Sequence, residues 1–290
     1  MNSEPLVTVG IPTYNRPGGL EKTLHDIRHQ TYERLEIIVS DNDSPDAKVE
    51  QILKSQVAED PRIRFFRQSQ NFGIGSNFDF VWRQSSGDYF MWAADDDRWE
   101  SGFIASLIGR MDVEKNIGMG FCNFDVRYPD GSDASTLYPP FSESFRHFTE
   151  ANAYRRLRSF ILQPENHGKA NLFYSLFRRD ILVRVNPISY LMGGRWGFDM
   201  LLACDALSRT AFALDESIQY HVGIAANNAS PSSADTSSLP PALKTREVGY
   251  FSGYIQIILR SPLLNSSQKL KLLLTCGRKA MRWTLLNSKN

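Results

Sequence analysis

The sequence has few cysteines, no long apolar run and almost no excess charge. The three cysteines, Cys122, Cys204 and Cys276, are far apart and odd in number, which argues against a disulfide framework and a Cys-x-x-Cys metal site. No apolar run is long enough to cross a bilayer, and the first residues lack the pattern of a signal peptide. The formal net charge of +1 gives no electrostatic case for binding nucleic acid. We therefore expect a cytoplasmic protein with no nucleic-acid partner.

The last part of the chain lacks acidic residues. No aspartate or glutamate follows Glu247, whereas seven basic residues do: Arg260, Lys269, Lys271, Arg278, Lys279, Arg282 and Lys289. Residues 268–274 and 279–286 combine these charges with an amphipathic pattern. Such a tail is typical of a peripheral contact with the inner face of a membrane, and also of terminal helices that dock on the body of the protein with their lysines in solvent. Both interpretations remain open.

The first half of the chain alternates between strand and helix patterns. Apolar runs typical of buried strands occupy residues 6–11, 35–39, 63–67 and 89–94, with amphipathic helical spacing between them. This alternation predicts an α/β fold with a doubly wound, mostly parallel sheet and helices on both faces.

The second half is less regular. Strand patterns cover residues 119–128 and 172–177, a helix pattern covers 198–207, and residues 212–222 suggest a pair of short strands. We expect residues 1–110 and 111–228 to form two halves of one domain. Residues 229–290 would be a linker followed by the basic helical tail.

An acidic triplet, Asp95, Asp96 and Asp97, directly follows the apolar run 89–94. Three adjacent carboxylates repel one another unless a positive charge lies among them. The carboxyl ends of parallel strands are also where ligands bind. A divalent cation, Mg²⁺ or Mn²⁺, that holds a phosphate-bearing ligand would explain the triplet. A solvated acidic turn explains the triplet alone equally well. The choice between a cation site and such a turn therefore depends on the residues of the other loops that converge on the same edge of the sheet.

Five short motifs appear in an order and spacing that resemble a known family. They are residues 7–16, Gln30-Thr31-Tyr32, residues 36–41, Asn71-x-Gly73 with Asn77, and Gly87-Asp88-Tyr89 ahead of the triplet. Together they resemble the family 2 inverting glycosyltransferases, which have the GT-A fold. The resemblance is close over the first hundred residues and continues loosely to about residue 221.

The resemblance implies a site for a nucleotide-diphosphate sugar, most simply a UDP-sugar. The donor-binding residues that it implies are Pro12, Thr13, Tyr14, Asn15, Asp41, Asn71, Asn77, Asp95 and Asp96. Asp41 would accept a hydrogen bond from the base, and Asp96 would face the sugar. Asp97, with Asp95 and His221, would ligate a Mn²⁺ or Mg²⁺ ion that bridges the diphosphate.

The resemblance also implies a catalytic base. Gly197-Phe198-Asp199 resembles the helix start that carries the base in this family, although an acid in the first turn is also a favourable partner for the helix dipole. Trp196 and Asn171 would flank the acceptor.

The sequence therefore predicts a metal-dependent, inverting, non-processive hexosyltransferase. It would transfer a sugar to a hydroxyl of a glycan or lipid-linked acceptor in cell-surface polysaccharide synthesis. A nucleotidyltransferase and a non-catalytic nucleotide-sugar-binding protein are the alternatives. The first would show a glycine-rich phosphate loop where Pro12 and Thr13 stand here, and Asp199 argues against the second. A processive synthase is disfavoured because no Gln-x-x-Arg-Trp motif follows Asp199.

Overall fold

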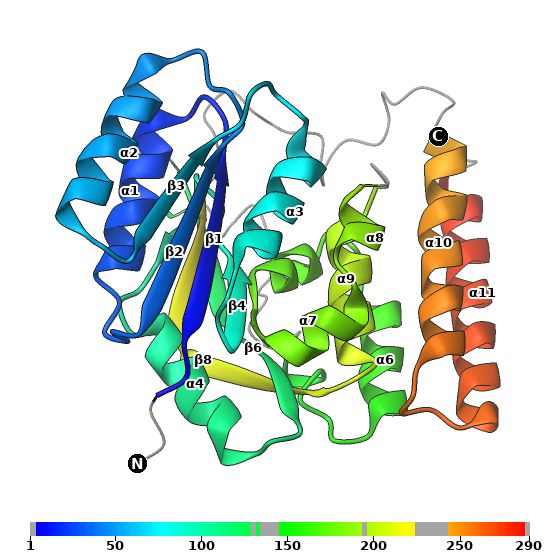
Figure 1. Ribbon diagram of the computed structural model, residues 1–290. Helices are drawn as coiled ribbons and strands as arrows, with labels where there is room; N and C mark the ends of the chain where they lie inside the picture. The colour runs from blue at the N-terminus through cyan, green and yellow to red at the C-terminus, as the bar shows by residue number, and fades with distance from the viewer. Residues whose placement is uncertain (1–3, 129–131, 134–144, 193–195, 224–242, 288–290) are drawn as a thin grey trace.

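The structure is a computed structural model that describes residues 4–128, 132–133, 145–192, 196–223 and 243–287. At its centre lies one sheet of eight strands in the order β3-β2-β1-β4-β7-β6-β8-β5. Helices lie on both faces of this sheet, and the two last helices stand side by side at one end of the molecule (Figure 1). The predicted α/β class and mostly parallel sheet are confirmed.

The first half of the sheet is parallel, as the alternating pattern predicts. Its elements are β1 (Val7–Thr13), α1 (Pro17–Arg28), β2 (Leu35–Asp41), α2 (Ala47–Glu59), β3 (Ile63–Arg67), α3 (Ile74–Gln84) and β4 (Tyr89–Trp92). Every residue of β1 and of β4 is buried, which explains why their sequences are apolar runs rather than alternating patterns. The register pairs Thr13 with Asp41 and Gly10 with Trp92, so the carboxyl ends of these strands meet at one edge.

The second half of the chain extends the sheet with antiparallel and parallel pairs. Its elements are β5 (Arg98–Trp99), α4 (Phe103–Val113), β6 (Ile117–Arg127), α6 (Ala153–Leu162), the 3₁₀ helix η2 (Lys169–Tyr174), β7 (Leu176–Arg178), α7 (Arg179–Val185), α8 (Ile188–Leu191), α9 (Phe198–Leu207) and β8 (Ala211–Gly223). Strand β7 runs antiparallel between β4 and β6 and so joins the two halves. The predicted division at residue 110 stays a prediction.

Two local predictions in the second half are wrong. Residues 172–177 were expected to form one strand, but the chain forms η2 and then the short β7. Gly168, with φ of 74°, starts this 3₁₀ turn, and a short apolar run cannot by itself separate a strand from a buried helical turn. Residues 212–222 form one strand, β8, because a bulge between the pairs Cys122–Asp215 and Asn123–Gln219 leaves residues 216–218 without partners in the register and lets the strand continue.

The C-terminal helices are α10 (Leu243–Arg260) and α11 (Ser266–Asn287). Helix α10 packs on α9, and α11 packs on α6. Lys279 Nζ of α11 donates hydrogen bonds to Ile161 O at 2.6 Å and to Gln163 O at 2.8 Å, at the carboxyl end of α6. The predicted linker at 229–242 lies outside the described residues. Within the described residues, no helix is long and apolar enough to span a membrane.

Candidate active site

Three polar side chains meet where β1, β2 and β4 end. Thr13 at the end of β1 lies beside Asp41 in the register, and its Oγ1 donates a hydrogen bond to Asp95 Oδ2 at 2.7 Å. Asn77 on α3 donates from one amide nitrogen to Thr13 O at 3.2 Å and Ser40 O at 3.0 Å, which ties the ends of β1 and β2 together. The structure thus brings together residues that lie far apart in the sequence.

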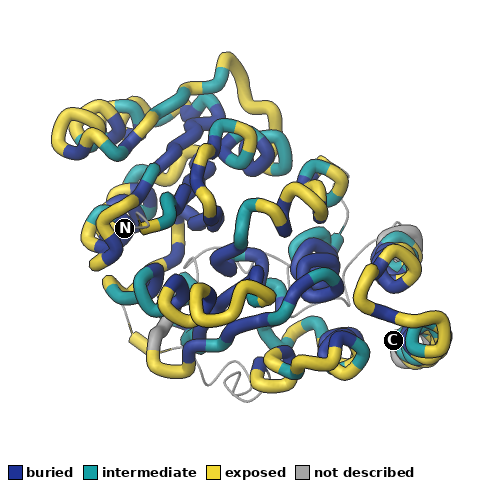
Figure 2. The backbone as a smooth tube through the Cα atoms, turned by 60° about the horizontal axis from the view of Figure 1, so that its bottom comes forward, coloured by how far each residue is buried: buried dark blue, intermediate teal, exposed yellow. Residues whose placement is uncertain are grey.

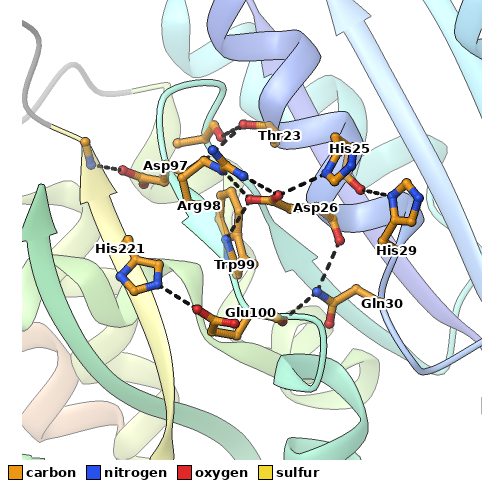
Figure 3. A network of polar contacts seen from close by, with 12 residues as sticks. Thr23, His25, Asp26, His29, Gln30, Asp97, Arg98, Trp99, Glu100 and His221 are labelled. Atoms are coloured by element: carbon orange, nitrogen blue, oxygen red, sulfur yellow. Dashed lines mark hydrogen bonds and ion pairs between the residues drawn. The ribbon is translucent and has the colours of Figure 1, made fainter. Parts of the chain in front are cut away.

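Helix α1 holds the backbone of the acidic triplet. Thr23 Oγ1 donates to Ala94 O at 3.1 Å and to Asp97 O at 3.2 Å, on either side of the triplet. Asp26 accepts a hydrogen bond from the Trp99 amide at 3.1 Å and pairs with the Arg98 guanidinium (Figure 3). These contacts fix the loop after β4 against α1.

Two glycines allow the backbone of the triplet to lie close to its neighbours. A Cβ at Gly19 of α1 would lie 2.0 Å from Asp95 O, and one at Gly223 of β8 would lie 2.1 Å from Asp96 O. No side chain fits at these distances, so the backbone of the triplet packs directly against the backbones of α1 and β8.

The three acidic side chains differ in environment. Asp95 and Asp97 are buried, whereas Asp96 is exposed. Arg16 bridges Asp95 and Asp96. Its Nη1 atom lies 3.2 Å from Asp95 Oδ1 and also contacts the carboxylate of Asp96. Asp97 accepts hydrogen bonds from the Tyr220 hydroxyl and, at 3.0 Å, from the Gly223 amide. Neither Arg16 nor Tyr220 has a role predicted from the sequence, although Arg16 belongs to the motif 7–16 and Tyr220 precedes His221.

Burial raises the pKa of Asp95 to about 6 and that of Asp97 to about 7. The negative charge of Asp96 raises both further, while hydrogen bonds from Thr13 and Tyr220 act in the opposite direction. A divalent cation at these carboxylates would offset the cost of their burial. Such ions are commonly held by one or two carboxylates together with substrate phosphates, so the donor chemistry of Asp95 and Asp97 fits a Mg²⁺ or Mn²⁺ ion.

His221 lies on β8 near the triplet but faces other partners. Its Nδ1 contacts Asp125, and its Nε2 lies 3.0 Å from Glu100 Oε1 (Figure 3). Among the residues that the structure describes, no three His, Cys, Asp or Glu side chains form a group that could hold a metal ion. A metal-binding role for His221 stays a prediction, and this arrangement of its ring gives it no support.

Several residues predicted to bind the donor lie around the ends of β1 and β2. Asp41 is buried and accepts hydrogen bonds from the Ser44 amide at 3.0 Å and from Arg67 Nη1 at 3.2 Å. Pro12 is buried within β1, Tyr14 is exposed, and the backbone of Asn15 has a positive φ of 56°.

The side chain of Asn71 belongs to the same edge of the sheet. Its Oδ1 accepts a hydrogen bond from Asn42 Nδ2 at 2.8 Å. The structure therefore gathers these predicted donor-binding residues at one edge of the sheet, and their contacts with a nucleotide stay predictions.

Asp199 occupies the first turn of α9, as the sequence predicts. Its Oδ1 accepts a hydrogen bond from the Met200 amide at 2.7 Å. Burial raises the pKa of Asp199 to about 6, against these backbone hydrogen bonds and the positive charge of Lys169, which lower it. A carboxylate with a pKa near the working pH suits a general base.

Tyr174, at the end of η2, lies within electrostatic range of both Asp199 and the triplet. Burial raises the pKa of its hydroxyl well above the usual value, and the charges of Asp97, Asp96, Asp199 and Asp95 raise it further. Its ring lies beside that of Tyr220, with ring centroids 6.0 Å apart, and the Tyr220 hydroxyl donates a hydrogen bond to Asp97. Sequence analysis missed Tyr174, because an aromatic residue next to Phe173 gives no signal that separates a site from the core.

The two residues predicted to flank the acceptor lie apart. Asn171 lies in η2, partly exposed. The Trp196 ring packs against Tyr250 of α10 and Trp283 of α11, with ring centroids 4.9 Å and 5.9 Å away. Trp196 thus joins the start of α9 to the C-terminal helices, and acceptor contacts for both residues stay predictions.

The start of α9 depends on a glycine. Gly197 has φ of 74°, and a Cβ there would lie 2.7 Å from the Tyr250 ring. We expect Gly197→Ala to lower the free energy of unfolding by about 1–3 kcal/mol, through backbone strain and a clash with Tyr250.

Urea unfolding of the Gly197→Ala variant measures this change. Gly277→Ala on α11 is the matched control, since its Cβ meets nothing within 4 Å and should add up to about 1 kcal/mol of helix stability. An unchanged stability of Gly197→Ala would contradict the role of this glycine.

A cavity of about 1000 Å³ opens beside Asp95 and Asp96 of the triplet. It is lined by basic and titratable side chains of α1 and β8, including Arg16, Lys22 and His221, together with Asp95 and Asp96. Its lining includes neither Asp199 nor Tyr174. The cavity is therefore formed by α1, β8 and the triplet, without the proposed base.

Comparison with known proteins places the chain in a family. A sequence model described as "Glycosyl transferase family 2" matches residues 8–184, more than half of the chain. The Campylobacter jejuni GalNAc(5)-diNAcBac-PP-undecaprenol beta-1,3-glucosyltransferase is 34% identical over 105 residues, which cover 36% of this chain and 34% of that protein. The Bacillus subtilis protein named uncharacterized glycosyltransferase EpsJ is 28% identical over 189 residues, 63% of this chain and 50% of its own length. The chain spans about a third to a half of these two relatives.

Two solved structures have the same fold. Staphylococcus aureus TarS 1-349 in complex with UDP superposes with a TM-score of 0.63 at 15% identity, over 92% of this chain and 69% of that one. The mannosyltransferase PcManGT from Pyrobaculum calidifontis in complex with GDP-Man and Mn²⁺ gives a TM-score of 0.54 at 16% identity, over 99% of this chain and 85% of that one. The family match and these folds agree with the motifs, and the chain belongs to glycosyl transferase family 2 and has the GT-A fold.

Proposed function

We propose that the protein transfers a sugar from a nucleotide-diphosphate sugar, most simply a UDP-sugar, to a hydroxyl of a glycan or lipid-linked acceptor. The transfer would depend on a divalent cation and would invert the anomeric configuration. The observation that carries this proposal is the cluster after β4, where the buried Asp95 and Asp97 accept hydrogen bonds from Thr13 and Tyr220 and where Arg16 contacts Asp95. The charges of the triplet and of Asp199 all raise the pKa of the Tyr174 hydroxyl, so the proposed cation site and the proposed base act on a common neighbour.

Asp199 is the proposed general base. It would accept the proton of the acceptor hydroxyl while the oxygen forms a bond to the anomeric carbon and the bond to the phosphate oxygen breaks. Its half-buried position and raised pKa, about 6, leave it ionised but still basic near neutral pH. Asp199 as the one proposed base is consistent with a single displacement with inversion.

Asp95 and Asp97 are the residues that would hold the cation. When bound, the ion would neutralise negative charge on the diphosphate leaving group. Arg16, which contacts both Asp95 and Asp96, would then lie next to the phosphates, where a guanidinium can donate two hydrogen bonds to phosphate oxygens. Thr13 and Asn77 fix the position of Asp95 and of the end of β1 through the hydrogen bonds described above.

The names of relatives support the proposed setting in glycan synthesis. One relative is named as acting on an undecaprenol-linked glycan, and the TarS structure contains UDP. A lipid-linked acceptor would place the enzyme at the inner face of a membrane. The donor base, the sugar and the linkage are open to experiment.

A thermal-shift screen of nucleotide sugars tests the donor. With the right donor at a hundred times its Kd, binding to the folded state should add about 2.7 kcal/mol and raise Tm by several degrees. We expect this shift to need Mn²⁺ or Mg²⁺ and to be absent with EDTA. Nucleoside monophosphates serve as the matched control, because they lack the bridging diphosphate. Equal shifts with and without a divalent cation would contradict metal dependence.

A further inference from the structure

The C-terminal helices have an outward face that is exposed in the part of the chain that the structure describes. On α11, Leu272 and Cys276 are buried against the body, whereas Leu270, Leu274 and Met281 are 59%, 55% and 66% exposed. The spacing of these three residues places them on one stripe of the helix, opposite the buried side.

Helix α10 adds the exposed side chains of Val248, Ile255 and Leu259, and Figure 2 shows exposed residues along both helices. Docking on the body therefore uses only one side of each helix.

Basic side chains border this stripe, and the part of the chain that the structure describes pairs them with no carboxylate. Lys271, Arg278 and Arg282 are exposed on α11. Arg278 and Arg282 line a groove of about 600 Å³ between α11 and α6, together with Arg158 of α6. Three guanidinium groups without acidic partners thus converge on one groove.

The one acidic residue of this groove does not neutralise the arginines. Glu165 Oε1 is bound by Lys169 Nζ at 2.9 Å and by Lys279 Nζ at 2.6 Å. Leu162 and Trp283 give the groove an apolar wall. The groove therefore has the chemistry for an anionic group attached to an apolar one.

We propose that the outward face of α11, with Arg158 of α6, docks on a bilayer that contains anionic phospholipids. Leu270, Leu274 and Met281 would enter the boundary between headgroups and acyl chains, and the arginine groove would receive a phosphate headgroup. An apolar stripe flanked by Lys and Arg is the pattern of helices that lie in the plane of a membrane interface. The groove and the stripe belong to the same helix, so one orientation can engage both.

Charge favours this occupant over a second copy of the chain. No acidic residue follows Glu247, so two such faces would bring like charges together. The anionic surface of a membrane attracts Lys and Arg near it, with each contributing about fivefold to the affinity. The sequence-based alternatives of membrane contact and docking on the body are therefore compatible, because they use opposite sides of α11.

Co-sedimentation with vesicles tests this proposal. Vesicles of phosphatidylcholine alone are compared with vesicles in which part of it is replaced by phosphatidylglycerol. We expect the protein to bind the second kind at least tenfold more tightly, and to be released by high salt. Arg278→Glu with Arg282→Glu should lower this binding tenfold or more. Leu270→Ser with Leu274→Ser should lower vesicle binding by a similar factor, because this variant loses the apolar side chains that would enter the bilayer.

A matched control carries the same change of charge elsewhere. Lys54→Glu with Lys115→Glu alters two exposed lysines on α2 and beyond α4, and it should leave vesicle binding unchanged. Far-UV circular dichroism and Tm confirm that the exposed substitutions leave the fold intact. Wild-type vesicle binding by both α11 variants would overturn the proposal. So would a dimer in sedimentation equilibrium that either α11 variant converts to a monomer, because the face would then serve self-association.

Discussion

Replacing Asp199 by Asn is expected to lower kcat by about 10² to 10⁴-fold, the usual contribution of a general base. The substitution keeps the size of the side chain and its hydrogen bond from the Met200 amide but removes the basic oxygen. Because Asp95 and Asp97, rather than Asp199, are proposed to hold the cation and the diphosphate, the affinity for the donor should stay at the wild-type level. Steady-state kinetics with the donor found by the thermal-shift screen measure kcat, and isothermal titration measures donor affinity.

The pH profile gives a second readout of this role. Burial raises the pKa of Asp199 to about 6, and a base works only when ionised, so wild-type kcat/KM should rise with pH and level off above about 6. The residual activity of the Asn variant should lack this step. Asp205→Asn is the matched control, since Asp205 is a buried acid on the same helix that pairs with Arg209. If Asp199→Asn kept wild-type kcat, Asp199 would not be the base.

Replacing Asp97 by Asn is expected to abolish the part of donor binding that depends on a divalent cation. Asparagine can still accept a hydrogen bond from Tyr220 or Gly223, but it brings no charge to the cation. Loss of the ion's stabilisation of the leaving group should lower kcat/KM by at least about 10²-fold. The Mn²⁺-dependent rise in Tm with the nucleotide sugar should disappear.

Stability without metal separates this effect from simple misfolding. Burial raises the pKa of Asp97 from its usual 3.8 to about 7, so this carboxyl favours folding below pH 3.8, and that contribution is lost as the pH rises through 7. The metal-free Asn variant should therefore be at least as stable as the wild type above pH 7. Asp215→Asn is the matched control, because Asp215 is buried and pairs with Arg110 away from the site. Retention of the Mn²⁺-dependent shift in Asp97→Asn would remove Asp97 from the cation site.

The parallel half of the fold was predictable because its signals are local. Strands buried on both faces read as continuous apolar runs, and the helices between them show their own period, so β1 to β4 are evident from the sequence. The second half mixes antiparallel and parallel pairing over long separations. There, an apolar run such as 172–177 fits a strand or a helical turn equally well, and only packing around Gly168 decides.

The candidate site likewise contains residues that the sequence predicts and residues that only the tertiary structure places there. Asp95, Asp97 and Asp199 stand in motifs that can be read from the sequence. Arg16, Tyr174 and Tyr220 acquire a place in the site only through contacts across the fold, for example the hydrogen bond from Tyr220 to Asp97.

By itself, the sequence determined the α/β class, the order of the motifs and the basic character of the last helices. These properties depend on residue type and on spacing along the chain. Only the tertiary structure decided which charges meet, because contacts such as Arg16 with Asp95, or Lys279 with Glu165, join residues about eighty and more than a hundred positions apart. It also decided that α11 presents one apolar side to the body and another to solvent, since a helical pattern shows that a face exists but not what covers it.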